Sequence, residues 1–202
     1  MSERYSIVFS SNTGNTRLLA EAVRAALPQE KCDYFGTPDG SVPASDTVYA
    51  GFWTDRGTAD ETARAFLEKL RGKRVFLFGT AGFGGSEEYF DGVLANTEKA
   101  LDETNTVVGK FMCQGKMPPS VKERYLKMRE QPQCPPNVEM LIENFDRALS
   151  HPDEHDLAAL REKVREIYMN KLGNTPKYYR AFFCLPENHG QCPWFKKGYT
   201  YK

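Results

Sequence analysis

The chain has 202 residues, of which 40% are hydrophobic and 27% are charged, and its 27 basic and 27 acidic side chains cancel to a formal net charge of zero. This length suits one compact domain with an appended segment. Because the chain has no excess of basic residues to attract nucleic acid or anionic lipid, we expect neither as a partner.

No apolar run approaches the roughly 20 residues that a membrane-spanning helix needs. The N-terminus leads directly into a strand-like apolar segment and lacks the pattern of a secretory signal. Five cysteines form an odd set without C-x-x-C spacing, which argues against a disulfide framework. The sequence therefore predicts a cytoplasmic protein with free thiols and no membrane association.

The first 113 residues alternate short apolar runs with amphipathic stretches, the pattern of βα units that build a parallel sheet. The expected strands are 6–9, 32–36, 47–52, 73–80 and 106–113. The expected helices between them are 18–27, 59–71 and 86–102. Because crossovers between parallel strands are right-handed, we expect an α/β fold with a doubly wound, five-stranded parallel sheet in the order 2-1-3-4-5.

The regular alternation ends after Cys113. Residues 117–150 hold five prolines around two short helical patterns, which predicts an insertion before a last helix that starts near residue 151. We expect residues 1–172 to form the domain and residues 173–202 to be a C-terminal extension rich in aromatic residues. Cys184, His189 and Cys192 in that extension offer only three ligands, so no metal site is expected.

The clearest chemical signal is the first loop, Ser11–Thr16, between the first strand and the first helix. A phosphate there would meet the unpaired N–H groups and the positive dipole end of a helix, together with several hydroxyl donors. The loop has neither the Gly-x-x-x-x-Gly-Lys-Ser/Thr pattern of nucleotide hydrolases nor the Gly-x-Gly-x-x-Gly pattern of dinucleotide folds. It therefore predicts a site for a small phosphate monoester without Mg²⁺.

Two further loops follow the third and fourth expected strands. The second loop is Gly51–Gly57 and the third loop is Gly79–Ser86. In a doubly wound sheet these loops meet the first loop where the strand order reverses, which is where ligands bind. Trp53 and Phe83 stand among small residues in these loops, an arrangement that suits a flat ring stacked between aromatic faces.

These residues resemble the flavodoxin family, whose first loop has the pattern Ser/Thr-x-Thr-Gly-x-Thr. Ser11, Thr13, Gly14 and Thr16 fill its fixed positions. Segments 52–60, 79–90 and 113–118 are similar to a flavodoxin-like subfamily that includes a small protein encoded beside bilirubin reductase in gut bacteria. The resemblance implies an FMN-binding protein that delivers electrons to a redox partner, such as a tetrapyrrole reductase or another reductase.

By this resemblance the first loop holds the FMN phosphate and the other two loops hold the ring. The expected cofactor-binding residues are Ser11, Asn12, Thr13, Gly14, Asn15, Thr16, Trp53, Thr54, Asp55, Arg56, Gly57, Thr80, Ala81, Gly82, Phe83, Gly84 and Gly85. Thr54 would approach the ribityl-phosphate end, and the peptides around Arg56 would reorient beside the flavin N5. Trp53 and Phe83 are candidates either for ring stacking or for core packing.

Other readings of the same fold are weaker. A response-regulator receiver needs an acidic cluster after the first strand, where this chain has Ser10-Ser11-Asn12. A low-molecular-weight phosphatase needs a cysteine nucleophile where Ser11 stands. Two alternatives to an electron carrier stay open: an FMN-dependent oxidoreductase that acts directly on a quinone or another small molecule, and a flavin-free interaction module. The sequence does not define the oligomeric state.

Overall fold

The computed structural model describes residues 4–171. By its internal contacts the chain divides into two units, Met1–Val164 and Arg165–Lys202. The sheet and the residues up to Val164 belong to the first unit. The predicted C-terminal extension, with Cys184, His189 and Cys192, lies outside the described residues.

The element order follows the predicted alternation of strands and helices. The strands are β1 (Tyr5–Phe9), β2 (Cys32–Gly36), β3 (Thr47–Asp55), β4 (Thr58–Ala59), β5 (Arg74–Ala81) and β6 (Thr106–Gln114). The α-helices are α1 (Asn15–Ala26), α2 (Glu61–Leu67), α3 (Glu87–Glu98), α4 (Pro119–Arg129), α5 (Val138–Ala148) and α6 (Glu154–Lys171). A short 3₁₀ helix, Gln29–Lys31, precedes β2.

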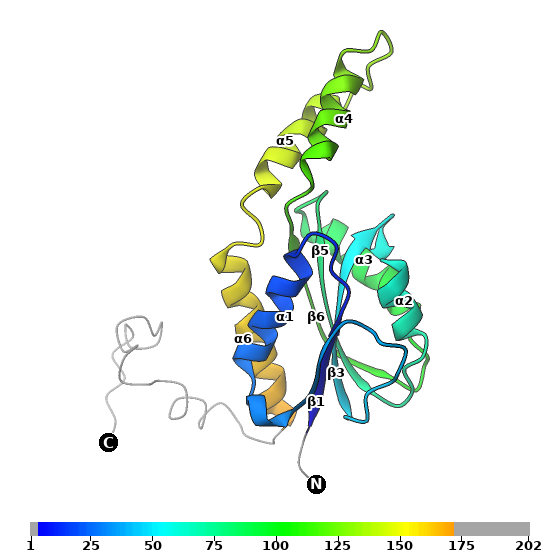
Figure 1. Ribbon diagram of the computed structural model, residues 1–202, viewed down its shortest axis with the longest axis vertical. Helices are drawn as coiled ribbons and strands as arrows, with labels where there is room; N and C mark the ends of the chain where they lie inside the picture. Colours follow the sequence, from blue (N-terminus) through cyan, green and yellow to red (C-terminus); the bar gives the residue numbers. More distant parts are fainter. Residues whose placement is uncertain (1–3, 172–202) are drawn as a thin grey trace, which may run out of the picture. The chain divides into compact units, whose positions relative to one another are not determined.

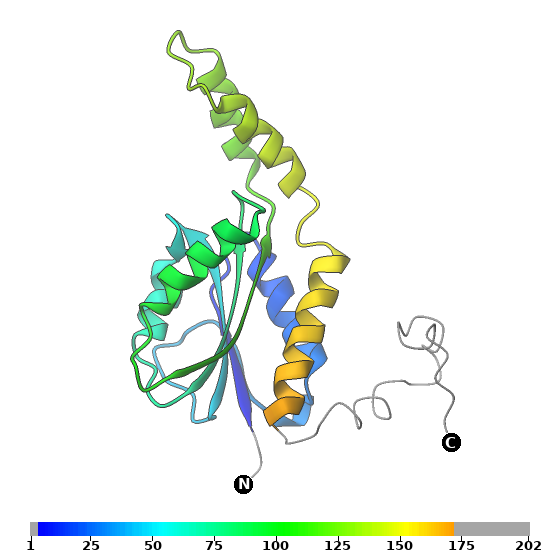
Figure 2. The ribbon, with the colours of Figure 1, turned by 180° about the vertical axis from the view of Figure 1, so that it is seen from behind.

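The five long strands are parallel and follow the order β2-β1-β3-β5-β6, while the short β4 pairs antiparallel with the end of β3. The predicted doubly wound, flavodoxin-like sheet is thus confirmed. Figures 1 and 2 show α1 and the first part of α6 over one face of the sheet, and α2 and α3 over the other. The fold is therefore a three-layer α/β sandwich.

Alternation along the central strands divides the core between the two faces. Tyr49 of β3 pairs in register with Phe76 of β5, and their rings lie 5.6 Å apart on one side of the sheet. The next pair, Ala50 and Leu77, points to the other side and joins the cluster that α2 and α3 cover. Both faces of these strands are buried, as the continuous apolar runs predicted.

The third strand is longer than expected. β3 continues through Asp55, and Arg56 and Gly57 then form a two-residue turn to β4, with φ angles of +48° and +79°. Positive φ at both central residues is the signature of a type I′ hairpin turn, whose twist matches that of the flanking strands. The expected loop at Gly51–Gly57 is therefore the outer half of a strand followed by a tight turn.

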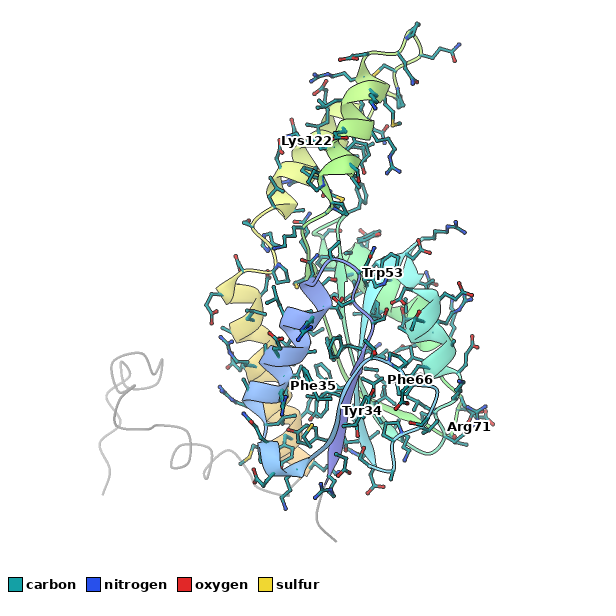
Figure 3. All side chains as sticks on the ribbon, in the orientation of Figure 1. Tyr34, Phe35, Trp53, Phe66, Arg71 and Lys122 are labelled. Carbon is teal, nitrogen blue, oxygen red and sulfur yellow. The ribbon has the colours of Figure 1, made fainter. Side chains whose placement is uncertain are left out.

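The insertion after β6 is a pair of helices. α4 and α5 pack against each other around a small cluster of apolar residues that is separate from the sheet core. Its buried members are Tyr125, Val138, Ile142 and Phe145. Lys122 of α4, labelled in Figure 3, forms an ion pair with Asp146 of α5. We refer to residues 119–148 as the helical hairpin.

Among the helices within residues 4–171, none combines the length and the apolar character needed to cross a membrane.

Candidate functional site

The first loop ends at the N-terminus of α1, with Gly14 in the left-handed region at φ +88°. Glycine adopts this conformation without steric cost, and it lets the chain turn directly into the helix. α1 begins at Asn15, three residues before the predicted start, and its N-cap position makes no side-chain hydrogen bond. Ser11 Oγ accepts from the backbone N–H of Arg17 at 3.2 Å, which places the loop over the helix start. An anion site at a helix N-terminus needs this kind of enclosing loop around N–H groups.

Asn15 organises this loop through its side-chain amide. Its Nδ2 donates to Thr13 Oγ1 and to the carbonyl oxygen of Lys116, both at 2.9 Å. Its Oδ1 is buried and has no hydrogen-bond partner among the described residues. A buried acceptor without a donor costs free energy, so this atom calls for a ligand or a water molecule at the loop.

Thr16 uses its hydroxyl inside the protein. The side chain is 1% exposed, and Oγ1 donates to the carbonyl oxygen of Phe52 at 3.2 Å and lies 3.2 Å from Oγ1 of Thr80. These contacts join the loop after β1 to the ends of β3 and β5, so the three predicted loops do converge. The sequence predicts hydroxyl donors to a phosphate in this loop, whereas the hydroxyl of Thr16 is directed at the strand ends.

The outer end of β3 carries Trp53 and Thr54, both partly buried. Trp53, labelled in Figure 3, pairs in register with Thr80 of β5, and its backbone exchanges hydrogen bonds with Asp60. Oγ1 of Thr54 is buried without a partner among the described residues, the second such atom at this edge of the sheet. The carbonyl oxygen of Gly57 in the adjoining turn accepts from Asn96 Nδ2 at 3.1 Å.

The third loop exposes an aromatic ring. Phe83 is 39% exposed and meets Tyr89 of α3 edge to face, with the ring centroids 5.9 Å apart. Gly84 and Gly85 follow with φ angles of +100° and +102°. Burial raises the pKa of the Tyr89 hydroxyl. An exposed ring beside two glycines in this region leaves a surface on which a planar ligand can lie.

The segment that leaves β6, residues 114–117, connects the loops of the site. The backbone N–H of Gly115 donates to the carbonyl oxygen of Ala81 at 3.0 Å, and a Cβ at Gly115 would lie 2.6 Å from the side-chain nitrogen of Asn15. The N–H of Lys116 donates to the carbonyl oxygen of His151 at 2.9 Å. This segment therefore contacts the first loop, the third loop and the chain just before α6.

The start of α6 carries a polar cluster around its acidic residues. His151 Nδ1 lies 2.6 Å from Asp156 Oδ2, and the side chains of Asp153 and Asp156 each accept from the other's backbone N–H. The hydrogen bond from the Asp156 N–H holds the pKa of Asp153 below its usual range. Burial, with the nearby Asp156 and Asp153 charges, raises the pKa of Cys113. The reciprocal bonds form a capping arrangement that fixes the first turn of the helix.

Comparison with known proteins gives a family for this fold and this loop. A family model described as the flavodoxin domain matches residues 6–165, which include all three loops. The chain belongs to the flavodoxin domain family. Membership makes it an electron-transfer flavoprotein in general type.

Two curated relatives share this assignment. A flavodoxin-like domain-containing protein BilS from Clostridium symbiosum (strain WAL-14163) is 38% identical over 176 residues, which cover 78% of this chain and 92% of the relative. A protein of the same description from Clostridioides difficile (strain CD3) is 28% identical over 155 residues, covering 75% and 88%. Among solved structures, the two-electron reduced flavodoxin of Megasphaera elsdenii matches with a TM-score of 0.42 and 24% identity, covering 71% of this chain and 98% of that one.

The residues present fit a flavin with a terminal phosphate. Thr54 Oγ1, a buried hydroxyl without a partner among the described residues, lies in the loop expected to meet the ribityl chain. Neutral N–H and O–H groups at a helix N-terminus suit a phosphate without a metal ion. A bound flavin would supply the redox chemistry, which the side chains of this site do not provide.

Proposed function

We propose that this protein binds FMN at the edge formed by the three loops and carries electrons to a partner reductase. The observation that carries the proposal is the first loop, where Gly14 leads into α1 without a side-chain cap of its own and Ser11 folds the loop back over the start of the helix. A phosphate bound there would receive hydrogen bonds from backbone N–H groups and from Thr13. FMN, which has a phosphate that riboflavin lacks, fits this loop.

Each loop has a separate task in the proposal. The first loop holds the phosphate, while Thr54 at the end of β3 receives a hydroxyl of the ribityl chain at its unpartnered Oγ1. Trp53 and Phe83 are the aromatic side chains available to contact the ring from β3 and from the third loop. Phe83 is the more exposed of the two and makes an edge contact with Tyr89.

A partner reductase is favoured over direct turnover by the domain content. A single flavodoxin domain spans residues 6–165, and the sequence has no Gly-x-Gly-x-x-Gly unit for a nicotinamide cofactor. The name BilS of the two relatives gives no substrate for this chain, so the partner is proposed by class only. We propose a cytoplasmic reductase that accepts electrons from the bound flavin.

The test begins with purified protein, FMN and riboflavin. We expect FMN to bind at least about 10-fold more tightly than riboflavin, as measured by quenching of flavin fluorescence, because only FMN can use the first loop. Dithionite titration of the complex should then show two separate one-electron steps. No turnover of NAD(P)H with a quinone is expected unless a reductase is added.

Other outcomes would favour a different function for the protein. Equal affinity for FMN and riboflavin would remove the phosphate role of the first loop. Steady oxidation of NAD(P)H with a quinone, by the protein alone, would support the direct oxidoreductase. Absence of flavin binding would favour the flavin-free interaction module.

A further inference from the structure

The helical hairpin is tied to the third loop by a compact hydrogen-bond cluster. Asn144 Nδ2, on α5, donates to the carbonyl oxygen of Gly82 at 2.9 Å. Gln114 Nε2, at the end of β6, donates to Asn144 Oδ1 at 3.0 Å and lies 3.5 Å from the same Gly82 oxygen. Asn144 is only 2% exposed, which is unusual for an asparagine on an amphipathic surface helix. The three groups therefore link the hairpin, β6 and the third loop.

The orientation of the Asn144 amide is fixed by its neighbours. Its oxygen faces the amide donor of Gln114, and its nitrogen faces the carbonyl oxygen of Gly82. Turning the amide over would place two oxygens against each other at Gly82 and two N–H groups against each other at Gln114. Only a side chain that offers one acceptor and one donor, at this length, satisfies both partners.

The third loop needs such support because its own backbone is permissive. Gly82, Gly84 and Gly85 restrict the chain little, and two of them adopt positive φ. Packing adds a second restraint, since a Cβ at Gly82 would lie 2.3 Å from the Cγ atom of Met117. Met117, like Asn144, comes from the insertion, so the inserted segment supplies both restraints.

We propose that Asn144 is a positioning residue, which with Gln114 clamps the helical hairpin to Gly82 and holds the third loop in the conformation that receives the flavin ring. This inference rests on the proposed function, because it assigns the third loop to the ring. The bonds of the clamp run to the third loop and not to the first. Its loss should therefore weaken binding of FMN and riboflavin by the same factor, whereas damage to the first loop affects FMN alone.

The substitution Asn144→Asp tests the clamp with almost no change in shape. At pH 8 the carboxylate has no donor and directs a charged oxygen at the Gly82 carbonyl, so both flavins should bind about 10-fold more weakly or worse. At pH 5 a protonated carboxyl group at this position can donate to Gly82 again, and most of the affinity should return. Recovery at low pH would show that the missing donor and the added charge, and not the shape of the side chain, cause the loss.

Asn137→Asp is the matched control, since Asn137 precedes α5 on the same hairpin, is exposed and makes no side-chain capping bond. It should bind both flavins like the unaltered protein at pH 5 and pH 8. Gln114→Ala, which removes one partner and adds no charge, is a milder second variant and should weaken both flavins a few-fold. It keeps the test decisive if Asn144→Asp does not fold at pH 8.

A measurement without flavin separates this inference from the proposed function. Amide hydrogen exchange of Phe83, Gly84 and Gly85 in the flavin-free protein should accelerate in Asn144→Asp at pH 8, relative to Asn137→Asp. Unaltered exchange and unaltered flavin affinity in a folded Asn144→Asp or Gln114→Ala variant would overturn the clamp. A loss for FMN but not riboflavin would overturn its link to the ring. If the unaltered protein bound no flavin, the proposed function and the positioning role would both fail, and faster exchange would then show a clamp without a flavin role.

Discussion

Thr13 and Thr16 stand three residues apart in the first loop but use their hydroxyls differently. Thr13 Oγ1 accepts from Asn15 Nδ2 near the loop surface, which leaves its own hydroxyl proton for a ligand. Thr16 is buried and donates to the carbonyl oxygen of Phe52. Side-chain contacts with a phosphate are therefore proposed for Thr13, and an internal structural bond is observed for Thr16.

Thr13→Ala should lower the affinity for FMN by about 10- to 100-fold, as expected for one hydrogen bond to a charged group. Riboflavin has no phosphate, and its affinity should stay unchanged. Fluorescence titration with the two flavins measures the affinity for FMN and the affinity for riboflavin on one protein preparation. Equal losses for the two flavins would show that Thr13 supports the loop as a whole and does not meet the phosphate.

Cys113 gives a prediction for alkaline pH. Burial raises the pKa of its thiol in the native state, whereas an unfolded cysteine loses its proton near pH ~8.5. Above that pH the unfolded chain binds fewer protons than the native one, so the free energy of unfolding falls as pH rises, by up to about 1.4 kcal/mol per pH unit from this group.

The measurement is urea unfolding between pH 8 and pH 10 of the unaltered protein and of Cys113→Ala. We expect a shallower pH dependence in the variant, whatever its stability at pH 8. Cys134→Ala, which removes an exposed thiol, should keep the original slope. The same slope in all three proteins would contradict a protonated Cys113 in the native state.

At the scale of single residues, the sequence predicted the convergence of the first loop with the strand ends because loops of a doubly wound sheet meet where the strand order reverses. It did not predict that Asn15 bonds to Lys116 O, or that Asn144 is buried against Gly82. Both contacts join positions far apart in the chain, and no local pattern marks them. Buried polar side chains with distant partners are the class that single-sequence reasoning misses.

The elements themselves were predicted more reliably than their ends. The five long strands and their order are confirmed, because continuous apolar runs in β3 and β5 are typical of a buried parallel sheet. The type I′ turn at Arg56 and Gly57 was missed, since Asp-Arg-Gly-Thr was interpreted as a ligand loop. α2 ends at Leu67, four residues before the predicted end, although Leu70 still packs in the core.

Close packing between β1, β3 and β5 leaves no room for a side chain at Gly51. A Cβ there would lie 2.5 Å from the Phe78 ring and 2.7 Å from the Cβ of Phe9. Gly51→Ala should therefore lower the free energy of unfolding by about 1–3 kcal/mol, the usual range for overpacking in a core.

Gly92→Ala is the control for that substitution. Gly92 lies within α3 with open space around its Cβ position, so alanine should raise stability by up to about 1 kcal/mol through its helix propensity. Urea unfolding of both variants gives opposite signs if this account is right. A neutral Gly51→Ala would mean that Phe78 moves aside without cost.

For the whole molecule, the formal net charge of zero leaves little long-range steering toward a charged partner. The length and composition predicted one main domain, and the family model covers residues 6–165 of it. The boundary expected at residue 172 stays a prediction. The folding of the hairpin into a separate small cluster could not be read from its prolines and short helical patterns, because its apolar residues face each other and not the sheet.

Flavin binding should stabilise the whole fold by mass action. At a free FMN concentration about 100 times the dissociation constant, the gain is about 2.7 kcal/mol, which corresponds to a rise in Tm of about 5–11 °C for a chain of this size. Thermal unfolding followed by far-ultraviolet circular dichroism measures it. Thr13→Ala at the same FMN concentration should gain less than about half as much, and an unchanged Tm in the unaltered protein would argue against a folded-state flavin site.

The bond from Lys116 N–H to the carbonyl oxygen of His151 brings both ends of the inserted segment together. Segments whose ends already meet can change in length or be exchanged at little entropic cost to the parent domain. Residues 117–150 are thus a natural place for related proteins to diverge, and for an engineer to graft another module. Any replacement would have to return an amide to the carbonyl of Gly82, so one side chain limits what this otherwise permissive position can accept.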